Sequence, residues 1–318
     1  MHRFLKAFSV FVAFSTYIIL LMGALVTTTG SEDGCGQTWP FCHGEILPSY
    51  VTVKLMIEYS HRIVSAAVGL FVLILAIWAW RTWPKDRKIH LFAASSVFFI
   101  IFQGLLGAAA VVWGQSDAAL ALHFGFSLLC FASVVLLSVR LFQLDRPDSS
   151  KQELQPVSKK LRYGIWGLAV YTYVVVYTGA YVRHTSSTMG CSTFPHCKET
   201  WIPDFVTQAG IQWTHRLFSY VLLLFVAWLT FVVVRYYRDR VDLRRGMIAS
   251  LILICLQALS GALIVLTPYY LVMALLHTTI VSVFFGALSY VCMQVGRPWQ
   301  AQKYTSDGEK SGVEPVTP

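Results

Sequence analysis

The sequence predicts an all-α integral membrane protein, built from eight transmembrane helices in two tandem four-helix bundles with pseudo-twofold symmetry. Three observations support this fold class. Apolar residues make up 56% of the 318-residue chain and charged residues only 13%, whereas an average soluble domain is about 25% charged. The apolar residues form eight blocks of at least 18 residues, and crossing a bilayer core takes about 20 residues of helix. Finally, the second half of the chain repeats motifs of the first.

Each apolar block is long enough for one spanning helix, and polar residues can occupy the first turn of some helices. The first block follows His2, Arg3 and Lys6, a basic start that resembles a signal peptide. It is long for a signal sequence and no small-residue cleavage site follows, so we expect a retained helix. In chain order the blocks span about 8–26, 63–80, 91–113, 118–139, 163–182, 217–234, 247–266 and 269–293.

The basic residues indicate the orientation of the helices. If the amino terminus is inside, the inner segments hold 20 of the 25 Lys and Arg residues. This distribution follows the positive-inside rule and predicts that both termini are cytoplasmic. Because topology explains the formal net charge of +9, we expect no nucleic-acid partner.

An internal repeat relates the two halves of the chain. Each repeat contains four spans, an even number, so both halves enter the membrane in the same direction and are expected to be related by an axis along the membrane normal. The matching pairs are His61 and His215, His123 and His277, and QGLLGA (103–108) and QALSGA (257–262), all at an offset of 154, with GALVTTTGS (23–31) and GAYVRHTSS (179–187) at an offset of 156.

The repeat divides the chain into an amino-terminal half over residues 1–145 and a carboxy-terminal half over residues 161–296. A polar segment over 146–160 is expected to link them on the cytoplasmic side. The tail over 297–318 is polar and rich in Gly, Ser, Thr and Pro, and we expect it to be disordered.

Four of the nine histidines lie near the outer start of an even-numbered span: His61, His123, His215 and His277. Ionisable side chains inside membrane spans are costly and mark function, although a single one can equally be a hydrogen-bonded interfacial residue. The second and fourth helices of each half run in the same direction, so their histidines face each other. Two opposed imidazoles are the usual arrangement for six-coordinate haem iron, which predicts one haem in each half. The other five histidines, including His184, are interpreted as solvated surface residues.

The two halves differ beside the first histidine of each pair. Glu58 lies one helical turn before His61, on the same face, and its counterpart Gln212 carries no charge. A carboxylate beside a haem moves a proton or stabilises positive charge; the alternative is that Glu58 meets water at the interface. The asymmetry predicts a reactive first half and a resident cofactor in the second. Arg62 and Arg216 directly follow these histidines. They are expected to snorkel to the interface or to pair with haem propionates, and both roles can hold together.

Two close cysteine pairs, Cys35/Cys42 and Cys191/Cys197, lie in loops assigned to the outside, where disulfides persist. Their spacings are poor for zinc, so we expect two intraloop disulfides, with a redox-active first pair as the alternative. The other three cysteines lie in apolar spans and are interpreted as small apolar fillers.

Together these features resemble the haem A synthase family (COX15/CtaA type), in particular its Gram-positive bacterial members. The resemblance covers residues 1 to about 296. It rests on the motifs EYSHR (58–62), LHFG (122–125), QWTHR (212–216) and LHTT (276–279), and on the cysteine pairs in CGQTWPFC (35–42) and CSTFPHC (191–197).

The resemblance implies that a methyl group of haem O is oxidised to a formyl group by successive hydroxylations, which gives haem A for terminal oxidases. It implies that haem O binds at His61 and His123 and a permanent haem b at His215 and His277, toward the outer leaflet. A substrate held by two histidines has no open iron position, so the oxidation requires either that one ligand leaves for direct oxygen activation or that another electron-transfer mechanism operates.

The resemblance also implies roles for the neighbouring residues and the partners. Glu58 matches the essential glutamate of the family. Cys35 and Cys42 match a pair with a suggested role in activity, whereas Cys191 and Cys197 match a structural pair. Haem O synthase, the membrane farnesyltransferase acting just upstream, is the implied partner, and an electron donor is required.

Two other functions remain open on the sequence. A di-haem cytochrome b would carry electrons from quinol across the membrane, but such proteins place their haems at different depths, and all four histidines here fall in the outer half. A haem transporter or chaperone without chemistry is also compatible with tandem parallel repeats.

Overall fold

The computed structural model describes residues 2–46, 48–114, 116–144, 156–197, 202–268 and 270–299. Most of the predicted linker (146–160) and nearly all of the predicted tail (297–318) lie outside these residues. The predicted boundaries of the linker and the tail therefore stay predictions.

Eight α-helices in the described residues are long and apolar enough to cross a membrane, which confirms the all-α class and the eight spans. The only further helix described is a short 3-10 helix, η2 (Ser187–Met189). The eight spans are α1 (Arg3–Thr28), α2 (Val53–Thr82), α3 (Arg87–Val112), α4 (Asp117–Leu144), α5 (Lys159–His184), α6 (Gln208–Tyr236), α7 (Val241–Leu266) and α8 (Tyr270–Val295).

Two of the helices begin well before their apolar blocks. The side chain of Thr52 accepts a hydrogen bond from the backbone N–H of Leu55 at the start of α2, and Thr207 accepts one from Gly210 at the start of α6. Such N-caps satisfy backbone donors that have no partner within the helix. The caps therefore place the motifs EYSHR and QWTHR inside helices, where they begin about one turn after the start.

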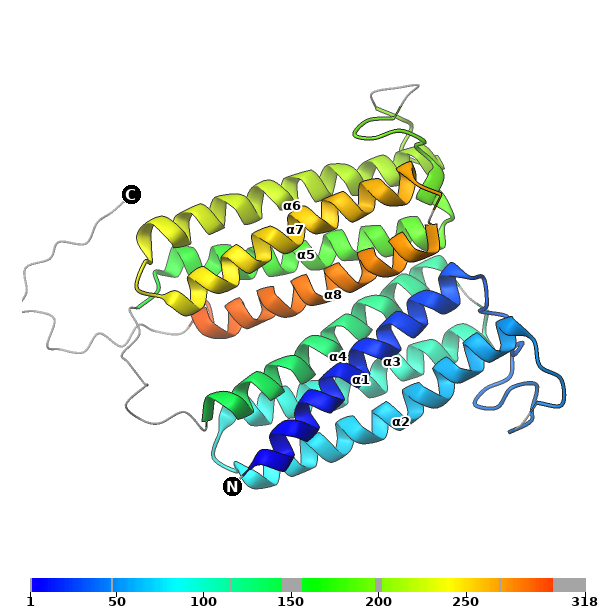
Figure 1. The fold of residues 1–318 in the computed structure, drawn as a ribbon, viewed down its shortest axis with the longest axis horizontal. Coiled ribbons are helices and arrows are strands. Elements are labelled where there is room, and N and C mark those ends of the chain that lie inside the picture. Colours follow the sequence, from blue (N-terminus) through cyan, green and yellow to red (C-terminus); the bar gives the residue numbers. More distant parts are fainter. Residues whose placement is uncertain are drawn as a thin grey trace, which may run out of the picture.

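The helices form two four-helix bundles, α1–α4 and α5–α8 (Figure 1). Within each bundle, consecutive helices contact each other and the first helix also contacts the fourth. Each bundle has its own buried apolar cluster, with Val72, Leu75 and Leu137 in the first and Val226, Leu229 and Leu288 in the second.

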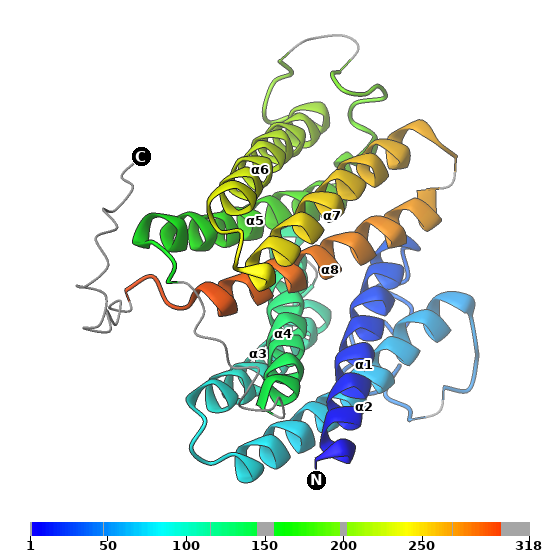
Figure 2. The ribbon, with the colours of Figure 1, turned by 60° about the vertical axis from the view of Figure 1, so that its left-hand side comes forward.

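The bundles pack together through α1 and α4 of the first and α5 and α8 of the second (Figure 2). Two tyrosines at matching positions of the repeat reach across this contact. The Tyr17 hydroxyl lies 3.0 Å from the hydroxyl of Thr279, and the Tyr173 hydroxyl lies where a side chain on Gly125 would be. Gly125 and Thr279 also match, at an offset of 154. Reciprocal contacts of this kind are what a pseudo-twofold axis between the halves produces.

The cysteine loops follow α1 and α5 and lie at one end of the molecule, and the starts of the even-numbered helices lie at the same end (Figure 1). The first residues of α1 and the end of α8 lie at the opposite end. There, Asp86 caps α3 and forms an ion pair of 2.5 Å with Arg140 of α4. Burial acts to raise the pKa of Asp86, but hydrogen bonds from Arg140 and from the backbone of Ile89 outweigh it, and the pKa is lowered.

Candidate functional site

The four candidate haem ligands lie at the cysteine-loop end of the even-numbered helices. Each follows the first residue of its helix by six to eight positions, which is a distance of about 9–12 Å along the helix axis. His61 is in α2, His123 in α4, His215 in α6 and His277 in α8.

All four histidines line a single cavity of about 820 Å³. Its walls are mostly apolar and come from every one of the eight helices. The sequence predicted a separate site in each half, whereas the cavity is continuous across the contact between the halves. An apolar cavity of this size, with a few convergent polar groups, is typical of a site for a cofactor or small ligand.

Hydrogen bonds at Nδ1 orient three of the four imidazoles. His123 Nδ1 lies 2.8 Å from the backbone oxygen of Gln103. His215 Nδ1 lies 2.9 Å from Thr178 Oγ1, and His277 Nδ1 lies 2.9 Å from Ser260 Oγ. A ring held at Nδ1 presents Nε2 for metal binding, and such partners of a ligand histidine are the rule in metalloproteins.

Each of the four imidazoles also packs against a glycine on the preceding helix, where a Cβ atom would crowd it. The distances from a Cβ built on the glycine to histidine Cε1 are 3.3 Å for Gly23 and His61, 3.0 Å for Gly107 and His123, 2.8 Å for Gly179 and His215, and 3.1 Å for Gly261 and His277. Sequence reasoning missed these glycines. The available signal was that each belongs to a motif present in both repeats.

The residues of the cavity fit haem as the bound group. Paired imidazoles, apolar walls and glycines that admit the rings closely to the helix backbones suit a flat macrocycle with two axial ligands. In the described part of the chain, no group of three or more His, Cys, Asp and Glu side chains is arranged to hold a metal ion. Two opposed imidazoles would suit a porphyrin-bound iron, whose other four ligands would come from the macrocycle.

Glu58 lines the same cavity and is only 4% exposed. Its Oε2 accepts a hydrogen bond of 2.8 Å from the backbone N–H of Cys35, and its Oε1 lies 2.5 Å from Arg62 Nη2. The alternative that Glu58 meets water at the interface is therefore wrong, because its carboxylate is buried under the first cysteine loop.

Gln212 occupies the matching place in the second half. Its side-chain oxygen accepts a hydrogen bond of 2.5 Å from the backbone N–H of Cys191, and its amide nitrogen donates to the Thr188 carbonyl oxygen at 2.6 Å. Glu58 and Gln212 thus anchor their cysteine loops through the same contact. Anchoring the loop therefore needs no charge, and the charge of Glu58 is paired with Arg62 instead.

Arg62 and Arg216 line the cavity but extend toward the loops above it. Arg62 donates to the Thr38 carbonyl oxygen at 2.6 Å, and Arg216 donates to the Thr193 carbonyl oxygen at 2.7 Å. Arg216 is 7% exposed. Both guanidinium groups therefore reach the cysteine-loop end of the helices and are bound there by loop carbonyl oxygens, and snorkelling to the interface stays a prediction. The pairing with haem propionates stays a prediction.

The structure links Cys35 to Cys42 and Cys191 to Cys197 by disulfides. Both cysteines of the first pair are fully buried. Gly34 precedes this pair, and a Cβ there would lie 2.7 Å from the Lys54 carbonyl oxygen at the start of α2. The first cysteine loop is therefore pressed onto the helix that contains Glu58 and His61.

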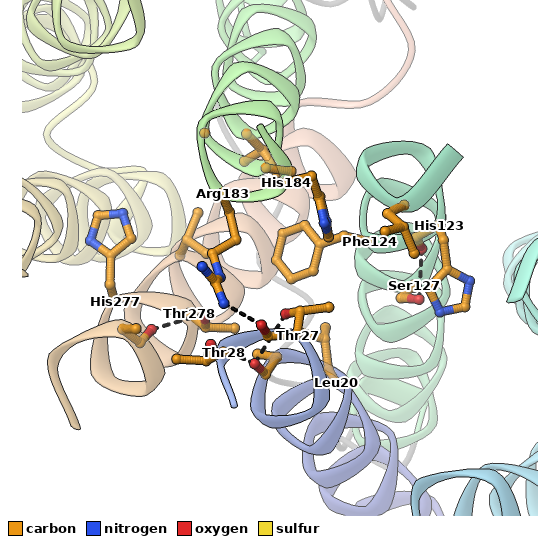
Figure 3. Close-up of a pocket in the computed structure, with 18 of the residues that line it drawn as sticks. Leu20, Thr27, Thr28, His123, Phe124, Ser127, Arg183, His184, His277 and Thr278 are labelled. Atoms are coloured by element: carbon orange, nitrogen blue, oxygen red, sulfur yellow. Dashed lines mark hydrogen bonds between the residues drawn. The ribbon is translucent and has the colours of Figure 1, made fainter. Parts of the chain in front are cut away.

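Arg183 and His184 form a second group of polar side chains in the cavity, where the two halves meet. In Figure 3 they lie between His123 and His277. Arg183 Nη2 donates to the Thr27 carbonyl oxygen of α1. The interpretation of His184 as a solvated surface residue is wrong, because α5 continues through this residue and places it in the cavity wall.

Known proteins similar to this chain were found by family model and by sequence. The COX15-CtaA model, described as cytochrome oxidase assembly protein, matches residues 6–289. A heme A synthase of Geobacillus kaustophilus is 40% identical over 317 residues, which are 100% of this chain and 99% of the relative. A heme A synthase of Alkalihalophilus pseudofirmus is 43% identical over 299 residues (94% and 99%). One of Shouchella clausii is 44% identical over 303 residues (93% and 99%).

Proposed function

The chain belongs to the COX15-CtaA family of cytochrome oxidase assembly proteins, and from that premise we propose that it is a haem A synthase. It is a multi-pass membrane oxidoreductase that converts haem O to haem A. The observation that supports this function best is one apolar cavity with two histidine pairs and a buried carboxylate beside only one of them.

We assign haem O to His61 and His123, and a resident haem b to His215 and His277. The position of Glu58 supports this assignment, because it lines the cavity one turn from His61. The matching residue in the second half, Gln212, is neutral. A site that only holds a cofactor needs no carboxylate, whereas oxidation of a carbon releases protons that a carboxylate can accept.

The reaction converts a methyl group through two hydroxylations to a gem-diol, which loses water to give the formyl group. When bound, haem b supplies one-electron redox chemistry. Glu58 accepts a proton released at the methyl carbon or stabilises positive charge that develops there. Burial of its carboxylate under the first cysteine loop excludes bulk water, which strengthens that electrostatic interaction.

Arg62 and Arg216 complete the two sites in this proposal. Each donates to loop carbonyl oxygens, and a guanidinium group has five N–H donors, so donors remain for haem propionates. Propionates held there point toward the cysteine loops.

We assign a structural role to Cys35 and Cys42, because both are fully buried. A redox cycle of this disulfide would require the loop to open.

We place the cysteine loops outside and both termini in the cytoplasm. The support is the positive-inside pattern of the sequence, in which the segments predicted to be inside hold 20 of the 25 Lys and Arg residues. The haem sites then lie in the outer half of the membrane, where a farnesyl tail can extend between helices into lipid. Haem O synthase is the proposed supplier of substrate, and the reaction also needs an electron donor.

A di-haem cytochrome b is the second candidate, since it also uses pairs of histidines. All four histidines lie at the same end of the helices, which does not suit a path for electrons across the membrane. Extraction of haems from protein co-produced with the farnesyltransferase separates the two candidates. The synthase contains haem O or haem A besides haem b, whereas only haem b in that preparation contradicts the proposal.

Glu58→Gln tests the chemistry directly, because the amide oxygen can still accept the Cys35 N–H, as Gln212 does with Cys191. We expect the variant to retain both haems and to form no haem A. Glu58→Ala is the matched comparison, which also removes the loop anchor. If Glu58→Gln still forms haem A at the wild-type rate, Glu58 is not the catalytic acid. A transporter or chaperone forms no haem A with either residue.

A further inference from the structure

The four ligand histidines are held unequally, and the difference follows the repeat. In the second half, hydroxyl groups of Thr178 and Ser260 bind Nδ1 of His215 and His277. In the first half, the matching positions are Met22 and Leu106, at offsets of 156 and 154. Neither side chain has a hydroxyl oxygen to accept a hydrogen bond from Nδ1–H; leucine has no polar atom, and the thioether of methionine is only a weak acceptor.

His123 compensates for the missing hydroxyl. Its Nδ1 lies 2.8 Å from the backbone oxygen of Gln103. The Gln103 side chain accepts a hydrogen bond of 3.1 Å from Ser127, one turn after His123 on α4. This ligand is therefore tied to α3 both directly and through its own helix.

His61 has no such support. Its Nδ1 is buried and has no hydrogen-bond partner among the residues that the structure describes. Its contact with the neighbouring glycine is also the loosest of the four, because a Cβ on Gly23 would lie 3.3 Å from its Cε1, against 2.8 Å for Gly179 and His215. A buried imidazole without a partner has no preferred orientation set by hydrogen bonding, so its ring reorients at lower cost.

We propose that His61 is the exchangeable axial ligand of the substrate site and that Met22 keeps it exchangeable. This inference rests on the proposed function, in which haem O binds at His61 and His123. The Fe–N bond to His61 breaks with its electron pair remaining on neutral imidazole, and it re-forms after turnover, without change of oxidation state. His123 remains bound, so the substrate stays in place while one iron position opens.

An exchangeable ligand also suits the entry and release of the substrate haem. Haem O must enter and haem A must leave at each turnover, whereas haem b stays. The hydroxyl partners follow this difference, because the second half has two of them and the first half has none at the matching positions. Met22 and Thr178 are positioning residues in this scheme, since they act on the iron only through the imidazoles.

The test is Met22→Thr, which restores to His61 the partner that His215 has. The two haems differ chemically, so the loss of each from purified protein to excess apomyoglobin is followed by extraction and chromatography. We expect Met22→Thr to slow the loss of haem O by about tenfold or more, the usual scale for a partner of a metal ligand, and to weaken carbon monoxide binding to the reduced substrate haem. Loss of haem b should not change. Met22→Leu is the matched control and should behave as the wild type.

The reciprocal variants keep the proposal falsifiable if Met22→Thr does not fold. Thr178→Val should speed the loss of haem b about tenfold, and Thr178→Ser, which retains the hydroxyl, should restore wild-type retention. Equal haem O loss in Met22→Thr and Met22→Leu, or equal haem b loss in Thr178→Val and Thr178→Ser, overturns the proposal. Absence of any farnesylated haem from the wild type refutes the proposed function instead.

Discussion

The contact between Gly179 and His215 allows a quantitative prediction for Gly179→Ala. A Cβ atom at this position would lie 2.8 Å from Cε1 and 3.2 Å from Nε2 of the imidazole, whereas non-bonded carbon atoms prefer about 3.5–4.0 Å. The ring must therefore move by on the order of 1 Å. Its hydrogen bond to Thr178, 2.9 Å long, is then lost or badly strained.

The expected effect is a weaker haem b site in a folded protein. Overpacking of a buried site costs about 1–3 kcal/mol, which corresponds to about a 5- to 150-fold loss of affinity. In haem-free protein the ring can rotate away from the new methyl group, so this cost appears mainly when haem binds. The higher helix propensity of alanine acts equally on both states and does not affect the haem affinity.

The assay is retention of haem b by purified protein, together with the absorption spectrum of the bis-imidazole haem. Gly167→Ala is the matched control, because it lies on the same helix and no atom lies within 4 Å of a Cβ built there. It should retain haem b as the wild type does. Wild-type retention and spectrum in Gly179→Ala would refute the idea that this glycine sets the position of the ring.

Three further predictions concern other parts of the molecule. Gly107→Ala should weaken retention of the substrate haem, because a Cβ there would lie 3.0 Å from Cε1 of His123. Gly104→Ala is the control and should retain the haem, because no atom lies within 4 Å of a Cβ built there. Wild-type retention in both variants would contradict the prediction. The lowered pKa of Asp86 means that its ion pair stabilises the fold above the ordinary pKa of an aspartate, about 3.9, and that this contribution is lost as the pH falls through the lowered value. Asp86→Asn should therefore remove that part of the acid dependence of the thermal midpoint in detergent, and an unchanged acid dependence refutes it. Cys191→Ser should lower the free energy of unfolding by about 2 kcal/mol, because the disulfide no longer closes the short loop, and the variant should still form haem A. Loss of haem A formation in a folded variant would show that this loop also takes part in the reaction.

The spans were predictable because the bilayer imposes their length, and the repeat because its motifs can be read directly in the sequence. A helix must keep about 20 apolar residues to cross the membrane, so the eight spans stand out in the composition. The histidines were found for a related reason, since an ionisable group in such a span is rare and four of them share one repeat offset. The proximity of Glu58 to His61 followed from helical periodicity alone.

The surroundings of these residues depend on how the helices pack. Burial of Glu58 under a loop, the capture of Arg62 and Arg216 by loop carbonyl oxygens, and the place of His184 in the cavity all join segments that are far apart in the sequence or separated by a turn. No periodicity within one helix encodes such contacts.

The two histidine pairs, which look equivalent in the sequence, also show which features the sequence determines and which depend on helix packing. The sequence alone determined that there are two pairs, at matching depths in two matching halves. Only the tertiary structure decided which atoms hold each ring: Thr178 and Ser260 come from α5 and α7, one helix before the histidines they bind. A hydrogen bond forms or fails over a few tenths of an ångström, and that distance is set by the rotation and separation of packed helices.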